Sequence, residues 1–216
     1  MSEPTKEELQ AAEPGSFDTE TLTFEGKRGK KAQHLTRAEL EAAIARLEPA
    51  PRDQGKVVLL VARGPNGERT LHSEALLTEH GGMPGDRWVS QDKYGPEYQL
   101  ATMRADFARV IANGQPLELH GDNLFLELDL SSENLPTGSL VRLGQALLRV
   151  TPQAHNGCKK WVQRFGLAPM QMNLDPAHRP VHLRGIYFQV VEAGHVRPGD
   201  AAVVLERARV TAPTTA

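Results

Sequence analysis

The sequence predicts an α+β fold that is mainly β, built around a closed or nearly closed barrel. Short apolar stretches separated by turn residues recur along the second half of the chain, at residues 117–120, 124–130, 139–142, 145–151, 186–192 and 201–205. Short strands at such spacing are typical of barrels. Helical periodicity is clear in only two longer segments, residues 35–47 and 100–112, so we expect few helices.

The composition excludes several classes of protein. The 216 residues contain 25 Lys and Arg against 27 Asp and Glu, a formal net charge of −2, so nucleic acid is not expected as a partner. The 39% of hydrophobic residues can bury a core at this length. The longest apolar runs, such as Val57–Ala62, are far shorter than the roughly 20 residues that cross a bilayer. We therefore expect a soluble protein without a membrane partner and, because residues 1–25 resemble no signal peptide, a cytoplasmic one.

Changes in composition along the chain divide it into one domain with flanking segments. The N-terminus is too polar to order itself by burial, and no second composition shift marks another domain. The predicted division is a flexible tail over residues 1–34, a helix and linker over 35–55, the barrel domain over 56–206, and a C-terminal tail over 207–216.

Local signals place the first elements. Thr36 and Glu39 have the spacing of a capping box at the start of the first helix. Asn66-Gly67 predicts a hairpin between strands at residues 56–62 and 69–77. Residues 78–98 are rich in Gly, Pro and charge, and a loop of this length usually serves function. The helical period of residues 100–112 predicts the second helix.

The single cysteine, Cys158, cannot form an internal disulfide. It follows a turn and is expected to begin a short helix, where the cations Lys159, Lys160 and Arg164 would favour a reactive thiolate. The alternative is a buried thiol, because Trp161, Val162 and Phe165 follow at helical spacing and free cysteines are commonly buried. The residues alone leave both alternatives open.

Two further polar residues lie at strand ends, where side chains can meet a ligand. Asn123 precedes the apolar strand 124–130, and Arg184 precedes the strand 186–192. An amide can bind a polar ligand and a guanidinium suits phosphate. Each also has a structural alternative, a turn-forming asparagine and an ion-paired surface arginine.

The order of these motifs resembles the MOSC domain, the module shared with the C-terminal part of molybdenum cofactor sulfurases. The matching features run from residue 121 to residue 205: Gly121-Asp122-Asn123-Leu124, a turn from Gly138 to Gly144, Cys158 followed by Lys159 and by Arg164-Phe165, then Arg184-Gly185 and a closing Gly194 to Asp200.

The resemblance implies a MOSC-type β-barrel that binds the molybdenum cofactor, Mo-pyranopterin. Cys158 is then expected to ligate molybdenum as the catalytic residue, or to carry sulfur to it. The expected cofactor-binding residues are Asn123, Lys159, Arg164 and Arg184. The implied activity is that of an oxidoreductase reducing small N- or S-oxygenated substrates with electrons from a partner protein. The alternatives are a non-redox carrier of sulfur, supplied by a sulfur-donor protein as a Cys158 persulfide, or of cofactor, and an interaction barrel with a core cysteine.

Overall fold

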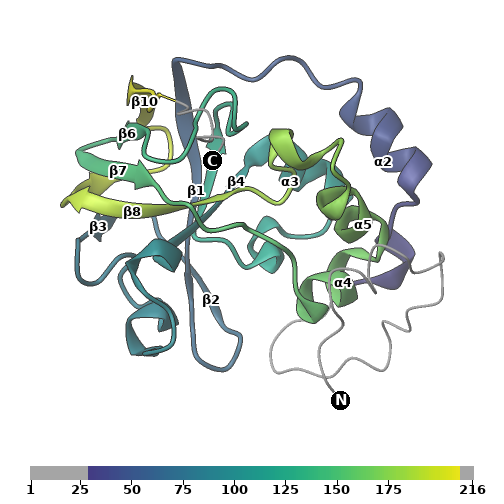
Figure 1. Ribbon diagram of the computed structural model, residues 1–216. Coiled ribbons are helices and arrows are strands. Elements are labelled where there is room, and N and C mark those ends of the chain that lie inside the picture. Colours follow the sequence, from purple (N-terminus) through teal and green to yellow (C-terminus); the bar gives the residue numbers. More distant parts are fainter. Residues whose placement is uncertain (1–28, 210–216) are drawn as a thin grey trace, which may run out of the picture.

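The computed structural model describes residues 29–209, in which the strands form a barrel and the helices gather beside it (Figure 1). The strands are β1 Gln54–Arg63, β2 Arg69–Leu71, β3 Ala75–Leu77, β4 Leu100–Arg104, β5 Leu124–Glu127, β6 Leu140–Leu143, β7 Ala146–Val150, β8 Ile186–Glu192, β9 Gly194–Val196 and β10 Ala201–Glu206. The α-helices are α2 Arg37–Ile44, α3 Ala105–Ala112, α4 Lys159–Phe165 and α5 Ala168–Leu174. The 3-10 helices are η1 Lys31–Gln33, η2 Arg87–Ser90, η3 Pro96–Tyr98, η4 Leu117–His120 and η5 Arg179–Val181.

The predicted barrel is confirmed. Its strands follow the order β1-β5-β4-β8-β7-β6-β10, and β10 returns to pair with β1. Closure comes from an antiparallel register that sets Gln54 opposite Val203 and Lys56 opposite Ala201. Only the β4–β5 pair within this ring is parallel. The hairpin strand β2 extends from β1, while β3 and β9 form a separate two-stranded sheet.

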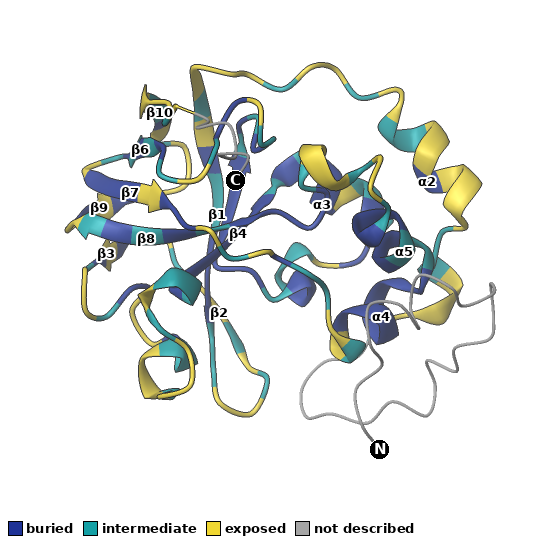
Figure 2. Cartoon of the chain, viewed as in Figure 1, coloured by how far each residue is buried: buried dark blue, intermediate teal, exposed yellow. Residues whose placement is uncertain are grey.

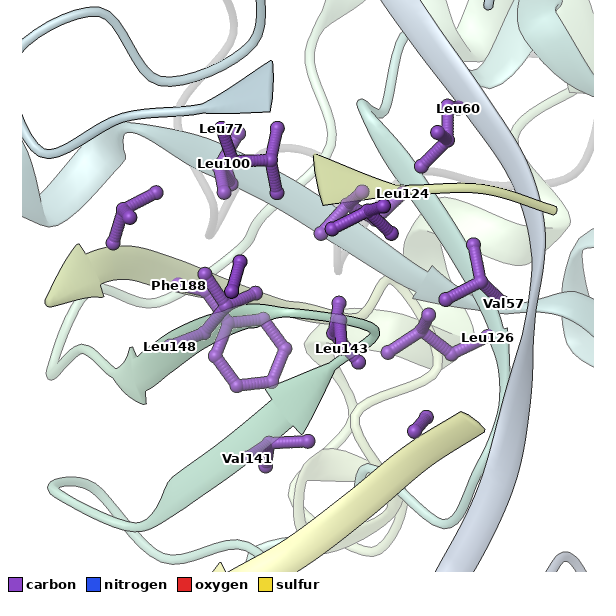
Figure 3. Packing of buried hydrophobic residues seen from close by; sticks show 14 of the residues in the cluster. Val57, Leu60, Leu77, Leu100, Leu124, Leu126, Val141, Leu143, Leu148 and Phe188 are labelled. Carbon is purple, nitrogen blue, oxygen red and sulfur yellow. The ribbon is translucent and has the colours of Figure 1, made fainter. Parts of the chain in front are cut away.

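Two apolar clusters hold the fold together. One fills the barrel with side chains from its strands, among them Leu60, Leu124 and Phe188 (Figure 3). The other lies between the barrel wall and the helices, where Leu40 of α2 and Phe165 of α4 are fully buried. Figure 2 shows the buried faces of α3, α4 and α5 turned toward the barrel. Because removing apolar surface from water is the main driving force of folding, the helices are part of the domain.

Three predicted elements were wrong. Residues 100–104 form strand β4, so that only residues 105–112 are helical. Nearly every residue of β4 is buried, and a continuous apolar run fits a central strand as well as a helix. Residues 117–120 form the 3-10 helix η4 instead of a strand, and the predicted strand 69–77 is split into β2 and β3.

Other local predictions are confirmed. Thr36 and Glu39 form the complete capping box of α2, with each side chain bonded to the other's backbone. The hairpin forms at Asn66-Gly67, where Gly67 has a positive φ of 86°. Within residues 29–209, no helix combines the length and apolarity needed to cross a bilayer.

The described end of the predicted N-terminal tail contacts the helix that follows Cys158. The backbone N–H of Lys30 donates to Oε1 of Gln115 at 2.7 Å, and Nε2 of Gln115 donates to the carbonyl of Arg164 at 3.0 Å. Gly29 lies so close to the backbone of Arg164 that a Cβ atom would not fit. The first 28 residues and residues 210–216 of the predicted tails lie outside the described residues.

Candidate functional site

A cleft of about 550 Å³ opens beside Cys158. The β1–β2 hairpin, the loop with η2 and η3, the segment before α4, α4 itself and β8 all contribute to its wall. Its cationic residues come from segments far apart in the sequence: Arg63, Arg69, Arg87, Lys93, Lys160, Arg164 and Arg184. The fold therefore brings these positive charges together in one cleft, although the formal net charge of the whole chain is −2.

Cys158 is exposed at this cleft, as the N-cap residue of α4. Its carbonyl accepts from the N–H of Trp161 at 2.9 Å, while its side chain makes no capping hydrogen bond. Trp161 and Phe165 are buried, so the apolar face of α4 begins after the cysteine. The helix expected at Cys158 is present, and the buried-thiol alternative is wrong.

Two arginines of the cleft are neutralised by buried carboxylates. The guanidinium of Arg63 donates two hydrogen bonds to the Asp86 carboxylate, from Nε to Oδ2 at 2.8 Å and from Nη2 to Oδ1 at 2.9 Å. Burial would raise the pKa of Asp86, but the hydrogen bonds from Arg63 outweigh it and the pKa is lowered. Arg184 donates from Nη1 to Oδ2 of Asp122 at 2.6 Å and from Nη2 to the carbonyl of His120 at 3.0 Å. Such pairs hold the wall in place.

Two other arginines, Arg69 and Arg87, meet no carboxylate among the described residues. Arg69 donates only to carbonyls, of Gly67, Glu68 and Glu118, and Arg87 makes no side-chain hydrogen bond with residues 29–209. Arg164 donates from Nη1 to the carbonyl of Leu119.

Burial and mutual repulsion make these three arginines electrostatically strained. Burial, with the charges of Arg87 and Arg63, lowers the pKa of Arg69 to about 10. Burial, with the charge of Arg69, likewise lowers the pKa of Arg164 to about 10. The pKa of Arg87 is lowered by burial and by Arg63, whereas a charge on Cys158 would raise it. A bound anion would relieve this repulsion, so the arrangement fits phosphate or another oxyanion.

Gly121 leaves the space into which two of these guanidinium groups converge. A Cβ atom at this position would lie 3.4 Å from Nη2 of Arg69 and 3.7 Å from Nη1 of Arg164. Gly121 also has a positive φ of 81°, which favours glycine. The absent side chain therefore allows a ligand oxygen to reach both guanidinium groups.

Aromatic rings form another part of the wall. All three tyrosines of the chain, Tyr94, Tyr98 and Tyr187, line the cleft. Tyr98 packs on Tyr94 with centroids 5.2 Å apart and edge-on against Tyr187 at 5.5 Å. Burial raises the pKa of Tyr187 to about 12, so its hydroxyl remains protonated. A planar ligand can stack on such a wall.

Two buried histidines border the cleft and differ in their partners. His120 uses both ring nitrogens: Nδ1 accepts from Trp161 at 3.1 Å, and Nε2 faces the carbonyl of Ala108 at 3.0 Å. His155 has Nε2 3.6 Å from Oδ1 of Asp122, and its Nδ1 has no hydrogen-bond partner among residues 29–209. Burial, reinforced by Arg184, lowers the pKa of both imidazoles well below 6.5.

The structure places the predicted site residues in different positions. Cys158, Arg164 and Arg184 line the cleft, whereas Lys159 does not and its neighbour Lys160 does. Asn123, predicted to bind the cofactor, does not line the cleft and is fully buried. Its Nδ2 donates to Asp86 at 2.7 Å and to the carbonyl of Val61, and its Oδ1 accepts from Ala101. Both N–H groups of the Asn123 amide are used inside the protein, so this buried residue helps to position Asp86.

Sequence reasoning missed Arg63, Arg69, Lys93 and His155. The arginines at residues 63 and 69 flank a hairpin turn, where a charged residue is ordinary. The sequence feature that pointed to this region was the long loop over residues 78–98, which contributes Arg87 and Lys93 to the cleft. Within the described part of the chain, no group of three His, Cys, Asp or Glu residues gathers as a metal site.

Comparisons with known proteins cover much of this region. A family model of the MOSC domain matches residues 91–203. The uncharacterized protein YflK of Bacillus subtilis (strain 168) is 32% identical over 87 residues, which is 40% of this chain and 37% of YflK. The matched segment thus spans little more than a third of that relative's length.

Two solved structures share the fold. The crystal structure of a hypothetical protein has a TM-score of 0.54 at 19% identity, covering 72% of this chain and 70% of that one. YiiM from Geobacillus stearothermophilus has a TM-score of 0.52 at 17% identity, covering 71% of this chain and 76% of that one. At these identities the likeness concerns the fold.

Proposed function

Because this chain belongs to the MOSC domain family, we propose that its cleft binds the pyranopterin molybdenum cofactor and reduces small N- or S-oxygenated compounds. The observation that carries the proposal is the exposed Cys158 beside Arg69 and Arg87, two arginines without a carboxylate partner among the described residues, with Arg164 lining the same cleft. A soft thiolate suits a transition metal, and guanidinium groups suit a phosphate. The donor set therefore fits both ends of the cofactor.

Each part of the wall has a separate task in this proposal. Cys158 holds the metal, and Arg69 and Arg164 bind the phosphate over Gly121. The tyrosines stack on planar groups, and the ion pairs of Arg63 and Arg184 keep the wall rigid. When bound, the cofactor supplies two-electron oxygen-atom transfer. The electrons come from a partner protein, because one cysteine cannot build an iron–sulfur cluster.

The test is the molybdenum and pterin content of protein purified from a host that makes the cofactor. We expect both in the wild type. Cys158→Ser should retain part of the pterin and lose molybdenum and reductase activity, because a hydroxyl is a harder and far less acidic ligand. Wild-type protein that contains neither molybdenum nor pterin would refute the proposal.

Gly121→Ala tests the phosphate position, and Gly114→Ala is its matched control. Both glycines have positive φ, 81° and 83°, so both variants bear similar backbone strain. Nothing lies within 4 Å of a Cβ atom at residue 114, whereas one at residue 121 enters the space between Arg69 and Arg164. We expect Gly121→Ala to lose most of its pterin and Gly114→Ala to keep it. Equal pterin content in the two variants would place the phosphate elsewhere.

The same exposed thiol fits the alternative of a sulfur carrier. A persulfide on Cys158 in protein that contains no molybdenum, detected by mass spectrometry after incubation with a sulfur donor, would favour that function. Molybdenum bound in equal amount to the protein favours the reductase.

A further inference from the structure

Resting on the proposed function, we propose that His155, held beside Asp122, delivers the protons that the reduction in this cleft consumes. Removal of oxygen from pyridine N-oxide breaks the N–O bond and forms water: C5H5NO + 2e− + 2H+ → C5H5N + H2O. Two reduced viologen molecules, each a one-electron donor, can supply the electrons in vitro. The protons must reach the reacting oxygen through the wall of the cleft.

Three groups of the cleft with shifted pKa values keep their protons at pH 7. The pKa values of Arg69 and Arg164 are lowered only to about 10, and that of Tyr187 is raised to about 12. His120 is committed through both ring nitrogens to Trp161 and to the carbonyl of Ala108. Among the described residues that line the cleft, His155 is therefore the imidazole that keeps a nitrogen free of hydrogen bonds.

His155 also lines a second cavity. A cavity of about 230 Å³ lies beside the cleft, and residues 154–156 line both. The imidazole packs on Tyr187 with centroids 4.4 Å apart, and its Nε2 lies 3.6 Å from Oδ1 of Asp122. This carboxylate oxygen is itself buried without a hydrogen bond among residues 29–209. The imidazole thus lies between a buried carboxylate and a second cavity.

The pKa of His155 depends on the charges around it, and it would change if a negative charge entered the cleft. Burial, Arg184 and Arg63 lower its pKa, and His120 and His182 act in the same direction. Burial raises the pKa of Asp122, although Arg184 opposes it. Each electron that enters the cleft adds a negative charge nearby, and a negative charge stabilises imidazolium. His155 then takes a proton from the second cavity and gives it to the departing oxygen.

The first experiment compares His155→Gln with the wild type, both loaded with cofactor, using reduced viologen and pyridine N-oxide. Glutamine keeps hydrogen-bonding capacity but cannot transfer a proton near neutral pH. We expect kcat to fall by about 10²- to 10⁴-fold, the range of general acid catalysis. Molybdenum and pterin contents should stay unchanged, and the residual rate should rise as the pH falls. The exposed His80→Gln variant is the control for the loss of a histidine.

The second experiment needs no turnover. In cofactor-free protein, inorganic phosphate should raise the pKa of His155 by about one unit in an NMR titration of histidine side chains. The Nε–H signals of Arg69 and Arg164 report binding, and Gly121→Ala should abolish both effects. Phosphate that shifts the arginine signals but not the pKa of His155 would contradict the relay. Arginine signals that do not respond would contradict the anion cleft and both proposals with it.

The activity experiment separates the two proposals in the same way. If the wild type contains molybdenum and reduces the N-oxide, and His155→Gln does so within twofold and with the same pH profile, the relay is wrong and the proposed function stands. Wild-type protein without molybdenum or activity overturns both.

Discussion

Arg184 and Arg87 line the same cleft, but among residues 29–209 only Arg184 forms an ion pair with a buried carboxylate. Arg184 is 5% exposed and bonds Asp122, which is fully buried. Arg87 has no such partner among the described residues. In a buried ion pair, loss of one member leaves the other charge without compensation. Identical side chains therefore serve the fold at one position and remain open to a ligand at the other.

We expect Arg184→Met to lower the free energy of unfolding by about 3–5 kcal/mol, because the Asp122 carboxylate would remain buried and unpaired. Adding Asp122→Asn should restore part of that loss. Arg87→Met is the matched control and should change stability by no more than about 0.5 kcal/mol. Urea unfolding measures all three. A loss below 1 kcal/mol in Arg184→Met would mean that the pair contributes little.

At the scale of elements, α4 joins the cleft to the N-terminal segment. Its first residue follows Cys158, and Arg164 in its last turn both faces the cleft and bonds Gln115 through its carbonyl. Gln115 in turn accepts from the backbone of Lys30. Residues 29–34 therefore support the helix that positions the Arg164 side chain at the cleft.

We expect removal of residues 1–34 to be more damaging than removal of residues 1–28. Only the longer deletion removes the hydrogen bond to Gln115 and the packing of Gly29 and His34 against residues 164 and 166. A hydrogen bond contributes about 1 kcal/mol, so the longer deletion should cost about 1–2 kcal/mol more. For a chain of this size each kcal/mol lowers Tm by about 2–4 °C. Equal Tm values in calorimetry would show that residues 29–34 are dispensable for stability.

At the scale of the whole molecule, burial of histidines couples folding to pH. The pKa values of His34, His120, His155 and His182 are all lowered, in each case first by burial. The unfolded chain binds protons at about pH 6.5, where the folded chain does not. The stability from these groups is fully present above pH 6.5 and declines as the pH falls toward their folded values.

We therefore expect the free energy of unfolding to decrease between pH 7.5 and 5.5. Each histidine kept neutral contributes up to about 1.4 kcal/mol per pH unit below 6.5. Urea unfolding at several pH values measures the slope of stability against pH, which should be smaller in His120→Asn than in the wild type. A stability that is constant or rises toward pH 5.5 would contradict this account. The raised pKa of Asp122 acts with the opposite sign in its own window above pH 3.8.

Local sequence patterns predicted an element correctly where the contacts that form it lie within a few residues of one another. The capping box at Thr36 and Glu39, the hairpin at Asn66-Gly67 and the helix start at Cys158 all formed where the sequence placed them. Residues 100–104 were wrongly predicted as helix because the contacts that make them a strand are not local. A strand buried on both faces has no alternation to distinguish it, and its pairing with β5 and β8 depends on distant residues.

The sequence by itself determined the barrel class, the position of Cys158 at the start of a helix, and the presence of Arg164 and Arg184 as candidate ligands. Only the tertiary structure decided the exposure of the thiol, the withdrawal of Asn123 behind the wall and the pairing of Arg184 with Asp122. It also brought Arg69, Arg87 and Arg164 together from three segments. The reason is physical: turns and caps form through short-range hydrogen bonds, whereas burial and charge compensation depend on which distant side chains barrel closure brings into contact.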